Sequence, residues 1–276
     1  MLPPIPTTST RCGRDTSRDA PVTRLVCLDI DGTLTDGVRG PALPGAVEAV
    51  RRVRARHPVR LVTNTTSLPH RVLAEHLADL GLLDRPESLV TPVTVARGVL
   101  PARGHASGIL LVEPGAREDY AWFREDADGP AVLLGTEGHT MTIADLQPAF
   151  RRLLQGGILY TLQRNRYFKK GGELMTDLGP IVAFLAYASG REGENLGKPS
   201  QILFDDVAAE AGVSRGEIVM VGDDAEFDVA ASVTLGMTGV LVRTGKYRPH
   251  DESRVAPAPT AALESIEELP RWLGIG

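Results

Sequence analysis

Short apolar runs alternate with amphipathic stretches along most of the chain from Arg24 onward. The runs RLVCLDI (24–30) and EIVMVGDD (217–224) are almost continuously apolar until they end in carboxylates. Such runs are typical of parallel strands that are buried on both faces. Between them, a 3.6-residue period predicts helices over about 44–56 and 69–80. The alternation therefore predicts βαβ units and a parallel sheet.

The middle of the chain repeats this alternation in shorter units. It contains three further predicted strands and a predicted helix over 142–157, while 164–179 is predicted to form a hairpin or loop and 180–190 a buried helix. Long units then return, and 260–274 is predicted to form an amphipathic helix. We expect an α/β protein with a doubly wound, Rossmann-like parallel-sheet core and an inserted smaller α/β cap. The expected division is a disordered tail (1–21), an N-terminal core segment (22–92), the cap (93–191) and a C-terminal core segment (192–276).

Composition narrows the class of protein. The chain has 276 residues, of which 42% are hydrophobic, as is ordinary for a globular protein. With 30 basic and 35 acidic residues the net charge is −5, so we expect neither a nucleic-acid partner nor a membrane partner. Two cysteines, Cys12 and Cys27, make no disulfide framework, and Cys27 is expected to be a reduced core thiol. We therefore expect a cytoplasmic protein.

Four polar segments occupy the ends of predicted strands or the start of a helix. Asp29 to Thr33 ends the first strand, Thr63-Asn64 ends a second strand predicted over PVRLVTN (58–64), and Gly222 to Asp224 ends a later strand. Lys198 opens a late helix. Ligands of open parallel sheets bind at the carboxyl ends of the strands. A DxDG segment alone is equally compatible with a simple turn. The four segments together favour a site in which carboxylates bind Mg²⁺ and a lysine and a hydroxyl bind phosphate oxygens.

The same segments carry a family resemblance. LDIDGTLTDG, LVTNTTS, GKPS and IVMVGDDAEFDV resemble the four ordered motifs of the haloacid dehalogenase superfamily of phosphatases, and the match spans about residues 24–248. The α/β module after the second motif resembles subclass IIA, whose members carry a large α/β cap. The resemblance implies a magnesium-dependent phosphatase acting on a small phosphorylated substrate, with phospho-amino acids or pyrophosphate as candidates. It also implies a homodimer through the cap.

The resemblance also implies roles for individual residues. Asp29 would attack phosphorus to form an aspartyl phosphate, and Asp31 would serve as general acid and then general base. Thr63 and the backbone amides around Asn64 would bind phosphoryl oxygens. Lys198 would neutralise charge between the nucleophile and the phosphate.

The implied metal site consists of Asp29, the Asp31 carbonyl and Asp223, with Asp224 or Asp228 as an additional partner. Asp224 is equally compatible with a helix N-cap, and Asp228 with a surface position in the following helix. Both alternatives stay open at the level of sequence.

Cations of the predicted hairpin are candidates for substrate contact, with a solvated hairpin as the alternative; they are Arg164, Arg166, Lys169 and Lys170. Two further functional classes stay open. One is a phosphotransferase that passes the phosphoryl group to an acceptor other than water. The other is a phosphoanion-binding or interaction protein with vestigial activity.

Overall fold

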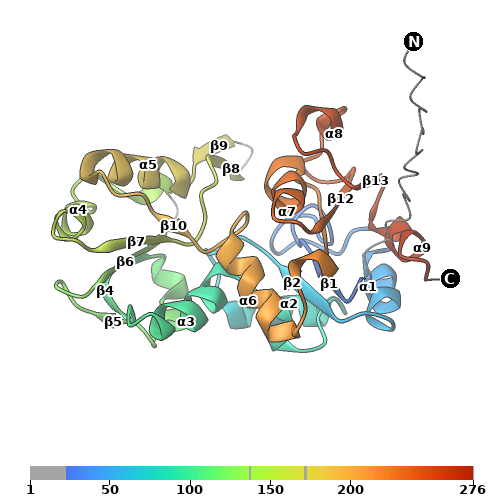
Figure 1. The fold of residues 1–276 in the computed structure, drawn as a ribbon, viewed down its shortest axis with the longest axis horizontal. Coiled ribbons are helices and arrows are strands. Elements are labelled where there is room, and N and C mark those ends of the chain that lie inside the picture. The colour runs from blue at the N-terminus through green and yellow to red at the C-terminus, as the bar shows by residue number, and fades with distance from the viewer. Residues whose placement is uncertain (1–22, 137, 171–172, 276) are drawn as a thin grey trace, which may run out of the picture.

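A computed structural model describes residues 23–136, 138–170 and 173–275, and leaves the side chains of 138, 169 and 170 undescribed. The predicted tail (1–21), including Cys12, lies outside the described residues. Two α/β lobes lie side by side (Figure 1), one built from both ends of the chain and the other from its middle. We call the lobe built around the six-stranded sheet the core lobe, and the lobe built around the five-stranded sheet the cap lobe.

The core lobe contains a six-stranded parallel sheet in the order β13-β12-β11-β1-β2-β3. Strand β1 lies between β11 and β2, so that Cys27 faces Met220 on one side and Arg60 on the other. The crossover order confirms the doubly wound α/β class. The strands are β1 (Leu25–Leu28), β2 (Val59–Val62), β3 (Leu89–Val90), β11 (Ile218–Gly222), β12 (Thr238–Val242) and β13 (Ala261–Leu263).

Alternate residues of β1 enter apolar clusters on opposite faces of this sheet. Val26 and Leu28 pack in the cluster that contains α1 and α2, whereas Leu25 and Cys27 pack in the cluster that contains α3 and α6. Cys27 is a free, buried thiol, and burial raises its pKa to about 12. The helices of the core lobe are α1 (Ala46–Arg54), α2 (His70–Asp79), α6 (Gln201–Ala211), α7 (Ala231–Thr234), α8 (Asp251–Arg254) and α9 (Leu269–Trp272). Helix α3 (Pro92–Ala102) packs against α6 and lies on the cap side in Figure 1.

The cap lobe contains a five-stranded parallel sheet in the order β10-β7-β6-β4-β5. An antiparallel hairpin, β8 (Tyr167–Lys170) with β9 (Glu173–Thr176), occupies the segment that was predicted to form a hairpin or loop. Strand β10 (Glu194–Asn195) falls within the predicted C-terminal core segment, yet it pairs with β7 of the cap sheet. The remaining elements are β4 (Ser107–Val112), β5 (Arg124–Glu125), β6 (Ala131–Gly135), β7 (Ile158–Thr161), α4 (Gln147–Leu154) and α5 (Leu178–Ser189).

Two segments differ from their predicted structure. The expected helix over 260–274 instead begins with β13, which pairs with β12 and completes the sheet edge before two short helical turns. Sheet pairing outweighs the local helical period here. Helix α5 is not buried all round, because Phe184 and Tyr187 on its outer face are exposed, Tyr187 to 93%. Within the described residues, no helix combines the length and apolarity needed to cross a membrane.

Candidate active site

Four buried charged side chains converge at the carboxyl edge of the core sheet. Asp29 directly follows β1 and Asp223 follows β11, and because these strands are parallel neighbours the two carboxylates lie at the same edge. Lys198 precedes α6, and Asp228 lies in the helical turn Ala225–Ala230. Their exposed fractions are 5% for Asp29, 1% for Asp223, 3% for Asp228 and 4% for Lys198.

Lys198 is the cation of this cluster. Its Nζ contacts Asp29 Oδ1 and lies 2.8 Å from Asp228 Oδ1. Burial alone disfavours the ammonium, but Asp228 and Asp29 outweigh it and hold the pKa of Lys198 above its usual range. Lys198 is therefore charged at neutral pH. One ammonium facing three carboxylates leaves the cluster with an excess of negative charge.

The three carboxylates are arranged to hold a divalent cation. Asp29, Asp223 and Asp228 each offer one oxygen, and these atoms lie within 4.8 Å of one another. Asp223 Oδ1 is buried and has no hydrogen-bond partner among the residues that the structure describes. Such an orphaned acceptor is costly unless a ligand satisfies it. Oxygen donors of this kind suit a hard divalent metal.

The pKa values of Asp29 and Asp223 reflect their burial and the excess of negative charge in the cluster. Burial raises the pKa of Asp29 to about 6, although Lys198 opposes the shift. Burial, together with repulsion from Asp29 and Asp228, raises the pKa of Asp223 to about 8. A bound dication removes this repulsion and favours the ionised carboxylates.

The Asp223 carboxylate is held by a backbone hydrogen bond and lies closely against two glycines. Its Oδ2 accepts a hydrogen bond from the Lys246 backbone N–H at 2.6 Å. Gly32 (φ +84°) and Gly245 (φ +57°) approach so closely that a Cβ on either would lie 2.2 or 2.1 Å from this same oxygen. Thr244 Oγ1 donates to the Gly32 carbonyl at 2.6 Å, which ties the two loops together. Only glycine fits both positions.

Lys246 is a site residue that was not predicted from the sequence. Its Nζ lies 3.7 Å from Asp224 Oδ2, and the side chain is 62% exposed. Asp228, Asp223 and the other site carboxylates hold the pKa of Lys246 above its usual range. The available signal was position alone, since Lys246 follows β12 at the edge where the other site residues lie.

The two alternative metal partners occupy different positions. Asp224 Oδ1 accepts from the backbone N–H groups of Glu226 (3.1 Å) and Phe227 (2.9 Å), so Asp224 caps the following helical turn. Among the described residues, the carboxylate cluster includes Asp228 and not Asp224. Gly222 makes room for the Asp228 carboxylate, because a Cβ on Gly222 would lie 2.3 Å from Asp228 Oδ2. The geometry thus favours Asp228, and a metal role for Asp224 stays a prediction.

The other predicted site residues lie on the loops after β1 and β2. Asp31 is half-buried two residues after Asp29. Thr63 Oγ1 is hydrogen-bonded to Thr65 Oγ1 at 3.0 Å and accepts from the Thr65 N–H at 3.1 Å. The Asn64 side chain is hydrogen-bonded twice to the backbone of Lys198. The general acid role of Asp31 and the phosphate-binding roles of Thr63 and Asn64 stay predictions.

The cations of the predicted hairpin segment differ in their contacts. Arg164 donates to the Gly193 carbonyl at 2.8 Å, within the cap lobe. Arg166 lies 3.4 Å from Glu226 of the helical turn that carries Asp228, and so links the cap to the core beside the site. The side chains of Lys169 and Lys170 lie outside the described portion of the chain.

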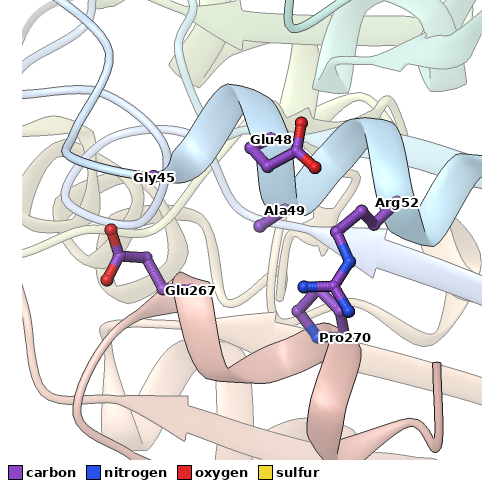
Figure 2. A pocket seen from close by; sticks show the side chains of 6 residues that line it. All are labelled: Gly45, Glu48, Ala49, Arg52, Glu267 and Pro270. Atoms are coloured by element: carbon purple, nitrogen blue, oxygen red, sulfur yellow. The ribbon is translucent and has the colours of Figure 1, made fainter. Parts of the chain in front are cut away.

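A small surface pocket is separate from this cluster. It has a volume of about 180 Å³ and lies between α1 and the C-terminal segment. Figure 2 shows its lining, with Arg52 and Glu48 on α1 and Glu267 and Pro270 opposite. None of the four buried charged residues lines it, so it does not belong to the candidate active site.

Comparisons with known proteins agree with this arrangement. Residues 26–122 match the family model for haloacid dehalogenase-like hydrolases, and residues 195–269 match a HAD-hydrolase-like model. Haloacid dehalogenase-like hydrolase domain-containing protein 2 of Bos taurus is 35% identical over 88% of this chain and 93% of its own length. Phospholysine phosphohistidine inorganic pyrophosphate phosphatase of Bos taurus is 37% identical over 89% of this chain and 92% of its own.

A solved structure extends the likeness to the fold. The 4-nitrophenylphosphatase of Thermotoga maritima superposes with a TM-score of 0.80 at 25% identity, covering 90% of this chain and 97% of its own. The family matches lie at the two ends of the chain, which also supply the candidate active site. The chain belongs to the haloacid dehalogenase-like hydrolases and is a phosphatase of their subclass IIA.

Proposed function

We propose that this phosphatase is magnesium-dependent and hydrolyses small phosphate esters or phosphoanhydrides through an aspartyl phosphate on Asp29. One observation carries the proposal. The Asp29 carboxylate contacts the Lys198 ammonium and shares a cluster with Asp228 and with the orphaned Oδ1 of Asp223. A nucleophile, a cation for the phosphoryl charge and a metal-binding set thus lie within one buried cluster, as phosphoryl transfer requires.

The chain's own residues account for the chemistry in two steps. An Asp29 oxygen forms a bond to phosphorus while the bond to the leaving oxygen breaks, and Asp31 gives that oxygen a proton. Asp31 then takes a proton from water, whose oxygen attacks phosphorus and releases phosphate and the free Asp29 carboxylate. Lys198 neutralises phosphoryl charge throughout. When bound by Asp29, Asp223 and Asp228, Mg²⁺ supplies positive charge against the phosphate oxygens.

Phospho-amino acids and pyrophosphate are the proposed substrate classes. Support comes from the relative whose name carries phospholysine, phosphohistidine and inorganic pyrophosphate. The test is phosphate release from nitrophenyl phosphate, phospho-amino acids and pyrophosphate, with Mg²⁺ and with a chelator. We expect release from at least one class with Mg²⁺ and loss of it with chelator. Phosphate appearing on an added acceptor would identify a transferase, and no reaction with any substrate would overturn the proposal.

A homodimer through the cap is also proposed. It is supported by the outer face of α5, where Phe184 and Tyr187 are exposed on a helix whose sequence, LGPIVAFLAYAS, has no charged residue. Exposed apolar patches of this kind are typical of interaction sites. Light scattering tests this proposal: the wild-type chain should be dimeric and Tyr187→Lys should shift it towards monomer. A monomeric wild-type chain would contradict it.

A further inference from the structure

Two hydrogen bonds join the Asn64 side chain to the main chain of Lys198. Asn64 Nδ2 donates to the Lys198 carbonyl at 2.7 Å, and the Lys198 N–H donates to Asn64 Oδ1 at 2.6 Å. The residues are 134 positions apart in the sequence. One amide therefore satisfies both the donor and the acceptor of the peptide backbone at Lys198, as a neighbouring strand would.

The main chain of Lys198 is attached to the other lobe. Three residues earlier, Asn195 pairs with Thr161 of β7 in the cap sheet, and the Leu196 N–H donates to the Thr161 carbonyl at 2.8 Å. Gly197 follows, where a Cβ would lie 2.2 Å from the Leu162 carbonyl and 2.6 Å from Asn64 Oδ1. The chain thus passes from the cap sheet to the catalytic lysine within three residues, through a contact that requires glycine.

Asn64 belongs to the core lobe. It follows β2, which pairs directly with β1, the strand that ends at Asp29. The pair with Lys198 therefore connects the lysine backbone to the strand next to the nucleophile. A lysine side chain has four rotatable bonds, so its ammonium is held beside Asp29 and Asp228 only if its backbone is also held.

We propose that Asn64 is a positioning residue that anchors the Lys198 peptide to the core lobe, so that the core and not the cap determines where the ammonium lies relative to Asp29. The inference rests on the proposed function for the role of Lys198. It gives the Asn64 side chain a role of its own, and leaves the predicted phosphate binding with the backbone amides around Asn64.

The test compares Asn64→Ala, the equally sized Asn64→Asp and the wild-type chain. Asn64→Asp keeps an acceptor for the Lys198 N–H but places an oxygen against the Lys198 carbonyl. Gln201→Ala is the matched control, because it removes an exposed amide three residues from Lys198. Two quantities are measured: kcat for nitrophenyl phosphate, and amide hydrogen exchange resolved along the chain.

We expect both Asn64 variants to lower kcat by about 10- to 100-fold, the range that a misplacement near 1 Å produces. Exchange should quicken in the segment 195–198 and stay unchanged in β1 and β11, while Gln201→Ala matches the wild type in both measurements. A kcat within twofold of wild type would overturn the inference. So would faster exchange throughout the core sheet, which indicates a merely structural role. Because exchange needs no turnover, an inactive wild type would overturn the proposed function and still leave the anchor tested.

Discussion

The ammonium of Lys198 lies 2.8 Å from Asp228 Oδ1. This buried ion pair connects the segment before α6 to the helical turn after β11, and the same ammonium contacts Asp29. Asp29 therefore shares its cation with a second carboxylate. The charge of Lys198 is divided between the proposed nucleophile and a proposed metal ligand, so loss of either partner changes the environment of the other.

Replacing Lys198 is expected to reduce both activity and stability. Lys198→Met leaves Asp29 and Asp228 buried without their cation, and breaking such a pair costs about 3 kcal/mol or more. Urea unfolding in chelator measures this loss. Lys246→Met is the matched control, since the Lys246 side chain is largely exposed and its loss is expected to cost less than about 1 kcal/mol. Equal stability of the two variants would contradict the account.

Replacing Asp223 is expected to separate stability from metal binding. Asp223→Asn removes a carboxylate that burial and its neighbours Asp29 and Asp228 disfavour. In chelator the variant should melt at a higher temperature than the wild type. Addition of Mg²⁺ should raise the melting temperature of the wild type but not of Asp223→Asn. A normal response to Mg²⁺ in the variant would argue against Asp223 as a ligand.

The stability of the metal-free protein is expected to fall between about pH 4 and pH 8. Burial raises the pKa of Asp29 to about 6 and that of Asp223 to about 8, from 3.8 for both. The folded state then binds more protons than the unfolded state in this interval, so these groups stabilise below pH 4 and that contribution is lost as the pH rises through the folded values. Mg²⁺ competes with the same protons, so its stabilising effect should be larger at pH 8 than at pH 6.

The measurement is the melting temperature with chelator and with Mg²⁺ across this range. Asp223→Asn provides the comparison and should have a shallower slope in chelator. If the melting temperature in chelator changed no more steeply with pH in the wild type than in Asp223→Asn, these carboxylates would not be the source of the pH dependence.

Replacing Gly245, one of the two glycines beside Asp223, is expected to weaken Mg²⁺ binding. The Cβ added by Gly245→Ala would lie only 2.1 Å from Asp223 Oδ2, and residue 245 has a positive φ of +57°. Gly212→Ala is the control, because Gly212 has a similar φ of +63° but nothing within 4 Å. Both changes should lose about 1 kcal/mol to backbone strain, but only Gly245→Ala should weaken Mg²⁺ binding, by about tenfold or more. Titration calorimetry distinguishes the two variants, and equal Mg²⁺ affinity would contradict the idea that Gly245 keeps room for the Asp223 carboxylate.

The central strands were well predicted from the sequence. The strands β1 and β11 are continuously apolar because both faces of the sheet are covered, and parallel pairing then brings Asp29 and Asp223 to one edge. The hairpin over Tyr167–Thr176 was also predictable, since glycines interrupt a polar segment there.

Contacts between distant segments were not predictable in this way. The Asn64–Lys198 pair and the closeness of Gly245 to Asp223 depend on how loops meet in space, which no local period encodes. The preference for Asp228 over Asp224 as a metal partner comes from the geometry of the helical turn, because both carboxylates follow β11. At the C-terminus, pairing of β13 with β12 overrode an amphipathic helical pattern.

The most direct test of the account is turnover by Asp29→Asn, measured as phosphate release from nitrophenyl phosphate in Mg²⁺. The amide keeps the size of the side chain but removes the nucleophilic carboxylate, so kcat should fall at least about 1,000-fold while the melting temperature in chelator does not decrease. If the folded Asp29→Asn variant had a kcat within tenfold of the wild-type value, an aspartyl phosphate on Asp29 would be contradicted.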